Sequence, residues 1–101
     1  MIKHIVMWKL KDSFKSAVKA QLCREVKDRL ETLPLLVPGL LQFEVGCSFT
    51  PPSDASADVV LLTAFKDKAA LAQYDTHPEH EKVKAYIRER VLERRTADFE
   101  I

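Results

Sequence analysis

The residues whose types and spacing are best suited to chemistry lie in one heptapeptide, Tyr74-Asp75-Thr76-His77-Pro78-Glu79-His80. It holds two of the three histidines and one of the two tyrosines in the chain. Proline is favoured in a first helical turn and pushes the preceding residue out of the α region, so His77-Pro78 predicts a helix entry. Two capping arrangements fit: His77 is the N-cap, or Thr76 caps the helix and forms a capping box with Glu79.

His80 falls in the first turn of this helix under either arrangement. The positive end of the helix dipole disfavours an imidazolium there, so His80 is expected to be neutral near pH 7. A neutral imidazole can accept a proton, and the phenol of Tyr74 can orient or polarise a substrate oxygen. The alternative is structural: Tyr74 and His80 hold a turn against the body of the protein.

The elements that position this heptapeptide follow from the spacing of apolar residues. Strands are predicted at residues 2–11, 41–49, 59–65 and 92–101, and helices at residues 16–33, 67–74 and 79–90. Apart from the short helix before the His-Pro turn, the order is β-α-β-β-α-β, which predicts a ferredoxin-like α+β fold with a four-stranded antiparallel sheet. The first and third strands are apolar on both faces at their centres, so they are expected in the middle of the sheet.

Helices on one sheet face leave the other face uncovered. The first strand places Ile5 and Met7 on one side and Val6 and Trp8 on the other. The uncovered side then exposes a larger apolar patch than monomers usually tolerate. A two-fold homodimer, formed through this open sheet face, is the simplest way to cover it.

Composition narrows the class of protein. At 101 residues the chain is expected to be a single domain, residues 1–101, and its formal charge of +1 gives no attraction to nucleic acid or to an anionic membrane. No apolar run is long enough to span a membrane and no signal peptide is recognised, so we expect a cytoplasmic protein. Cys23 and Cys47 have no metal or redox spacing and are expected to be reduced, buried thiols.

Neither a metal site nor nucleotide binding is predicted. The proline between His77 and His80 spoils a shared helical face, and no zinc-type spacing exists. The two glycines of the chain form no phosphate-binding loop, and no cofactor is expected.

Four segments together resemble the stress-responsive alpha/beta-barrel (Dabb) domain family, of the dimeric α+β barrel superfamily. They are Met1-Ile2-Lys3-His4-Ile5-Val6-Met7-Trp8-Lys9-Leu10-Lys11-Asp12, then Pro38-Gly39 followed by Phe43-Glu44-Val45-Gly46, then Tyr74 with His77-Pro78-Glu79-His80, and Asp98-Phe99-Glu100. The resemblance covers nearly the whole chain. It implies a dimeric α+β barrel in which two ferredoxin-like sheets pack face to face.

The resemblance also implies a pocket. One plant member of the family is a polyketide cyclase, and by similarity His80 corresponds to its general base and Tyr74 to its orienting phenol. The remaining residues expected to bind a ligand are His4, Val6, Trp8, Val26, Leu61 and His77. Cys23 and Val26 replace bulky aromatic residues of the cyclase pocket, so the cyclase substrate is not carried over.

Three functions follow from these observations. In the first, the pocket binds a small, mostly apolar, carbonyl-bearing molecule, and His80 removes a proton while Tyr74 steadies the oxygen, without a cofactor. In the second, the protein is a non-catalytic stress-response or ligand-binding dimer. The third, a cofactor-free monooxygenase-like enzyme, rests on fold analogy alone.

Overall fold

A single four-stranded antiparallel sheet forms one layer of the protein. The computed structural model describes residues 1–101, and the strand order is β4 (Gln42–Cys47), β5 (Val59–Phe65), β1 (Ile2–Leu10) and β6 (Val91–Glu100). The two central strands are β5 and β1, the first and third of the four predicted strands. The ferredoxin-like α+β fold and the positions of the central strands are therefore confirmed.

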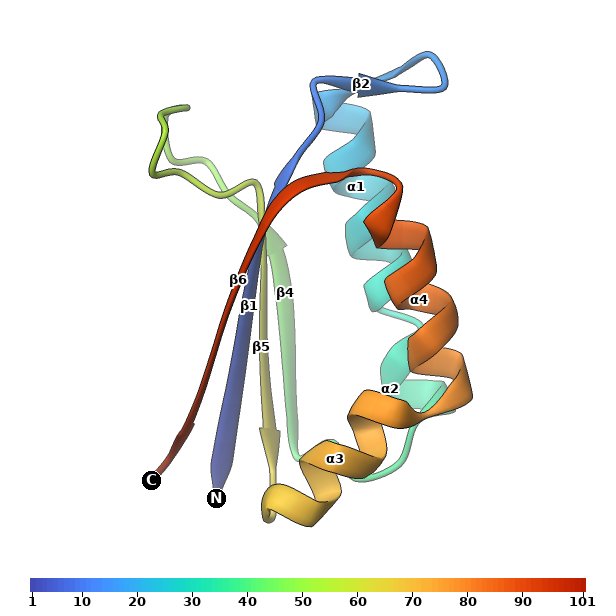
Figure 1. Ribbon diagram of the computed structural model, residues 1–101, viewed down its shortest axis with the longest axis vertical. Helices are drawn as coiled ribbons and strands as arrows, with labels where there is room; N and C mark the ends of the chain where they lie inside the picture. The colour runs from blue at the N-terminus through green and yellow to red at the C-terminus, as the bar shows by residue number, and fades with distance from the viewer.

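The helices form a second layer on one face of this sheet (Figure 1). They are α1 (Lys19–Leu30), α2 (Leu33–Leu36), α3 (Lys68–Thr76) and α4 (Pro78–Arg88). Helix α1 buries Leu22, Val26 and Leu30, and α4 buries His80, Val83 and Ile87. These side chains are spaced three or four residues apart, so each helix presents one stripe to the sheet.

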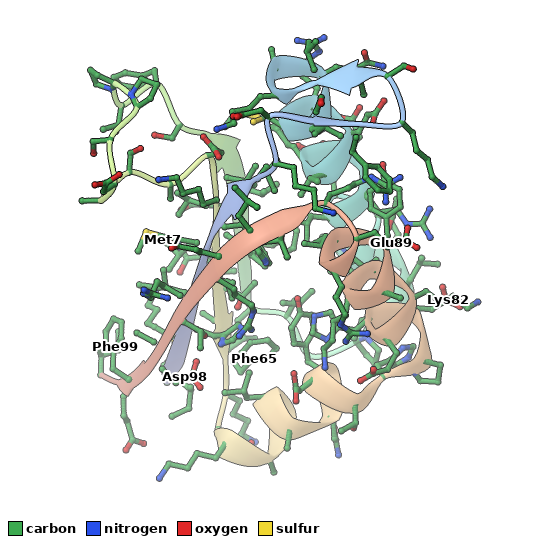
Figure 2. The ribbon with its side chains drawn as sticks, turned by 45° about the horizontal axis from the view of Figure 1, so that its top comes forward. Met7, Phe65, Lys82, Glu89, Asp98 and Phe99 are labelled. Carbon is green, nitrogen blue, oxygen red and sulfur yellow. The ribbon has the colours of Figure 1, made fainter.

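The sheet has one buried face and one open face. On β1 the side chains of Ile2, His4, Val6, Trp8 and Leu10 are buried against the helices. Ile5 and Met7 alternate with them and point the other way, where Ile5 lies opposite Leu62 of β5. Figure 2 shows Met7 and Phe99 pointing away from the helices; these side chains are 41% and 46% exposed.

The chain between β1 and α1 differs from the prediction. Ser13–Phe14 (β2) and Ala17–Val18 (β3) form a small hairpin, with Lys15 and Ser16 at its turn in the left-handed region. Positive φ at both central residues is the geometry of a tight hairpin turn. Helix α1 consequently begins at Lys19 rather than residue 16, and Val18, at the end of the hairpin, is 60% exposed.

The end of the first helix also differs. Helix α1 stops at Leu30, and Leu33 belongs to a separate single turn, α2, in which Pro34 lies in the first turn. Leu33 is still fully buried, because α2 carries it back onto the core. Pro34 thus lies at the start of a new turn after the break.

The two cysteines do not match the prediction of two buried thiols. Cys47 is exposed, whereas Cys23 is half-buried, and both are free. They are neighbours across α1 and β4 despite their separation in sequence, and burial raises the pKa of the Cys23 thiol to about 11. No helix of this protein is both long and apolar enough to cross a membrane.

Candidate functional site

The corner between α3 and α4 is capped by His77. Helix α3 ends at Thr76, whose hydroxyl donates a hydrogen bond back to the carbonyl of Ala72 at 3.0 Å. The Nδ1 atom of His77 accepts a hydrogen bond from the backbone N–H of Glu79 at 3.1 Å. Of the two capping arrangements that fit the sequence, the structure adopts the one in which His77 is the N-cap.

His80 lies in the first turn of α4 and is only 8% exposed. Its Nδ1 atom is 3.2 Å from the backbone carbonyl oxygen of Asp75. A carbonyl oxygen only accepts hydrogen bonds, so Nδ1 carries the proton and the Nε2 atom of the neutral ring keeps its lone pair. Burial, opposed by the hydrogen bond to Asp75, lowers the pKa of His80 below 6.5. The imidazole is therefore neutral at pH 7.

The Tyr74 ring packs against the face of the His80 ring. The two rings are stacked, with centroids 4.1 Å apart and planes inclined by 29°. The Tyr74 side chain is 1% exposed and also packs on Phe65 at 5.0 Å. Its hydroxyl is buried and has no hydrogen-bond partner, and this burial raises the pKa of the phenol above 10. An unpartnered buried hydroxyl is uncommon in proteins.

His4 approaches the same rings from the sheet. It lies on β1 opposite Asp98 of β6, and its Nδ1 atom is paired with the Asp98 carboxylate. The His4 ring meets the Tyr74 ring edge-on at 6.4 Å. The carboxylate is half exposed while the His4 side chain is 10% exposed, so Asp98 holds the imidazole from the solvent side. The three rings of His4, Tyr74 and His80 thus form one row from sheet to helix.

A cavity of about 350 Å³ opens between this face of the sheet and the helices. His4 and His80 are on its wall, and its apolar wall residues come from the sheet, α1 and α4: Val6, Trp8, Leu30, Leu61, Val83, Ile87 and Val91. Its charged wall residues are Asp75, Lys84, Arg88 and Arg94. A mainly apolar concavity with a few convergent polar groups is the usual form of a small-molecule site.

A shallower groove adjoins this cavity between α3 and β6. It encloses about 700 Å³ and shares His4, Asp75 and Arg94 with the cavity. The rest of its wall includes Leu71 of α3 and Phe99 of β6. A ligand longer than the cavity has room to continue along this groove.

The sequence matches the family described as "Stress responsive A/B Barrel Domain" over residues 2–101. The chain belongs to this family. Among curated proteins no significant match is found.

Solved structures share the whole fold of this Dabb domain. A dimeric protein of unknown function from Bacteroides fragilis is 28% identical, with a TM-score of 0.85, covering 99% of this chain and 95% of the other. A Dabb family protein from Mesorhizobium loti is 22% identical, with a TM-score of 0.71 and coverages of 99% and 95%. A hydroxynitrile lyase from Passiflora edulis is 12% identical, with a TM-score of 0.81 and coverages of 99% and 92%. At such low identities the last two likenesses establish the fold alone.

The Dabb domain brings most of the predicted site residues together. His4, Val6, Trp8, Leu61 and His80 all line the cavity. The structure does not place the other three predicted residues on its wall, and each has a different reason.

Val26 was expected to line the pocket, but this fully buried side chain does not reach the cavity, whereas Leu30, one turn later on α1, does. His77 was expected to contact a ligand, but its ring is turned to the backbone of α4 as the cap. Tyr74 is stacked on His80, which lines the cavity, but Tyr74 itself is not on the wall.

Sequence reasoning missed the charged residues of the cavity. Helical spacing carries the signal for α4, because Lys84 and Arg88 follow His80 at intervals of four residues and so share its face. For β6 the signal is the two-residue period, since Arg94 has the same parity as Asp98. Both periods identify further site residues only once it is known which face of α4 and of β6 lines the cavity.

Proposed function

We propose that this protein is a homodimer in which each subunit binds a small, mostly apolar, carbonyl-bearing molecule and acts on it by cofactor-free acid–base chemistry. His80 is the base that removes a proton from the carbon beside the carbonyl. The observation that carries the proposal is a buried, neutral imidazole on the wall of an apolar cavity, with Nδ1 occupied by the Asp75 carbonyl. Only Nε2 then remains to accept a proton.

Two further groups support this assignment. The carboxylate of Asp98 fixes the His4 ring, which gives the cavity a second oriented imidazole. The hydroxyl of Tyr74 has no partner within the protein, so it is free to donate to a substrate oxygen when the ligand enters behind the His80 ring. This proposed role for Tyr74 requires the stacked pair to move.

The dimer is supported by the open sheet face. Ile5, Met7 and Leu62 gather there without a covering helix, and Phe99 extends the patch on the edge strand. Several solved relatives of the same fold are described as dimeric. A second copy of the sheet is the natural cover for such a face.

A non-catalytic ligand-binding dimer is the second candidate, and the His80–Tyr74 stack favours it, because stacked rings can simply fill a corner of the fold. The hydroxynitrile lyase of the same fold supports an enzymatic role without specifying a substrate. A putative antibiotic biosynthesis monooxygenase from Nitrosomonas europaea also shares the fold, at 18% identity, and no side chain of the cavity favours oxygen chemistry in particular.

The experiment uses 4-phenylbutan-2-one, a small apolar ketone, in D₂O. Exchange of its α-protons for deuterium is followed by NMR in the presence of the protein. We expect protein-dependent exchange, and His80→Gln is expected to lower its rate by about 100-fold, the lower end of what a general base contributes. His77→Asn is the matched control, because this histidine lies three residues away but outside the cavity and asparagine retains the N-cap.

Three outcomes separate the candidates. Loss of exchange in His80→Gln alone supports catalysis. Binding of the ketone, measured by calorimetry, with no protein-dependent exchange supports the non-catalytic dimer. Equal exchange in wild type and His80→Gln contradicts the assignment of the base.

A further inference from the structure

The charged residues of the cavity are unevenly balanced. Three cationic side chains, Lys84, Arg88 and Arg94, share its wall with one carboxylate on that wall, Asp75. An excess of one sign in a partly enclosed apolar site raises the local concentration of ligands of the opposite charge. Whether the excess is real depends on the ion pairs that these groups already make.

Lys84 is fully engaged within the protein. Its Nζ atom is 3.0 Å from the carboxylate of Asp75, 3.0 Å from that of Glu81 and 2.7 Å from the backbone oxygen of Asp75. Together these contacts use the three donors of an ammonium group. Lys84 and Asp75 therefore neutralise each other and give the cavity no free charge.

The two arginines have no such partners. Neither Arg88 nor Arg94 has a carboxylate oxygen within 4.0 Å. Two carboxylates on the cavity and groove are occupied, since Asp75 binds Lys84 and Asp98 binds His4. The third, Glu100, lies on the groove six residues beyond Arg94 along β6 and makes no ion pair with either arginine. Two guanidinium groups thus remain uncompensated at this site.

Arg88 and Arg94 come from opposite walls. Arg88 ends α4, on the same helix face as His80, and Arg94 lies on β6 opposite Trp8 of β1. Arg94 also lines the adjoining groove, so it marks the junction of the two spaces. A guanidinium from each wall at a shared opening can hold one planar anion between them, because each offers a fork of N–H donors.

We propose that the ligand is an anion: a molecule with an apolar body and a carboxylate, which Arg88 and Arg94 bind at the mouth of the cavity. This inference rests on the proposed function, because it concerns the ligand of the same cavity. The apolar body then contacts residues such as Val6, Leu61 and Val83, and the carbon that reacts lies beside His80. A ligand held at both ends enters in one orientation, which is what proton removal from a single carbon needs.

The experiment compares 4-phenylbutanoate with 4-phenylbutanamide by titration calorimetry on the full-length protein. The two probes share the same apolar body and differ in charge. We expect the carboxylate to bind at least about tenfold more tightly at low salt, since hydrogen bonds to charged groups are the stronger class. The preference is expected to shrink as salt is raised, because the arginines are exposed.

Matched variants identify the groups responsible. Arg94→Gln and Arg88→Gln are each expected to remove most of the preference for the carboxylate, because binding of the amide falls much less than binding of the carboxylate. Arg95→Gln removes the same charge from the same strand, but this residue pairs with Met7 on the opposite sheet face, so the preference is expected to remain. Lys82→Gln is the control for α4, since Lys82 points outward from that helix (Figure 2).

The outcomes are distinguishable from those of the proposed function. Equal binding of the two probes overturns the anionic ligand and leaves the cavity site intact. The same loss in Arg95→Gln as in Arg94→Gln overturns it too, because the effect is then one of net charge. If neither probe binds at millimolar concentration, the proposed small-molecule site fails together with this inference.

Discussion

The rings of Tyr74 and His80 are stacked and buried together, but only the imidazole has a hydrogen-bond partner. His80 has its partner in the Asp75 carbonyl, so it is held in a single tautomer. The Tyr74 hydroxyl has lost water without gaining a partner. Such a cost to stability is typical of a group kept for a ligand, whereas a purely structural ring would not need the oxygen.

Tyr74→Phe is therefore expected to stabilise the protein by about 1 kcal/mol, the lower end of the cost of a buried unsatisfied polar group. The ring and its contact with His80 are retained. Urea denaturation measures the free energy of unfolding. A fall in stability would show that the hydroxyl makes a favourable interaction in the folded state. Weaker binding of 4-phenylbutan-2-one by the stabilised variant would place the hydroxyl in the site.

His80 makes the stability of the protein depend on pH in a known direction. Its pKa in the folded state lies below 6.5, so between that pKa and 6.5 the unfolded chain binds more protons than the folded one. The contribution of the neutral ring is complete above pH 6.5 and is lost as the pH falls through this window. We expect the free energy of unfolding to drop more between pH 7.5 and 5.5 in wild type than in His80→Gln. Equal drops would contradict the lowered pKa.

At the scale of elements, the corner between α3 and α4 sets the position of His80. Asp67 caps α3 by accepting from the N–H of Ala70 at 2.9 Å, and His77 caps α4. Lys84 then ties α4 to the end of α3 through Asp75. The Asp75 carbonyl that accepts from His80 also accepts from Lys84 of α4. The contacts that hold the corner together therefore also position His80.

The cap gives a prediction at this scale. His77→Ala is expected to lower the free energy of unfolding by about 1 kcal/mol, and His77→Asn is expected to restore most of it, because asparagine is a good N-cap. Thermal and urea denaturation of the two variants measure the difference. Binding of the ketone by His77→Asn is expected to match that of wild type. A loss of ketone binding in this stable variant would indicate that His77 contacts the ligand.

At the scale of the whole molecule, the helices leave one sheet face for another molecule to cover. The apolar side chains on that face lie on three strands, with Lys3 and Lys9 around them. Figure 1 shows no helix on this side of the sheet. The cavity lies on the opposite face, so a dimer formed through the open face leaves the site accessible.

Met7→Glu is expected to convert the protein to monomers at micromolar concentration, because a charge buried in an apolar interface is costly. Sedimentation equilibrium measures the mass. Leu35→Glu is the control: this residue is 91% exposed on α2, on the helical side. A wild-type protein that sediments as a monomer would contradict the proposed dimer, and so would a Met7→Glu variant that remains dimeric.

Sequence alone determined the periodic features of this protein. A two-residue period identified β1, a continuous apolar run identified β5, and a period near 3.6 identified α1 and α4. The His-Pro pair located the start of α4 to within one residue. Each of these follows from local geometry, in which neighbours along the chain decide the direction of a side chain. The placement of His4 and His80 in one pocket, by contrast, came from the family resemblance and not from periodicity.

Only the tertiary structure determined which buried side chains border the cavity and which distant residues lie close together. Val26 and Leu30 lie on the same stripe of α1 and are both buried in the core, but only Leu30 borders the cavity. Cys23 and Cys47 are neighbours, and Arg88 and Arg94 line one cavity, because the fold brings distant segments of the chain together. Periodicity gives the face of an element, whereas the position along that face at which two elements converge depends on how whole helices and strands pack.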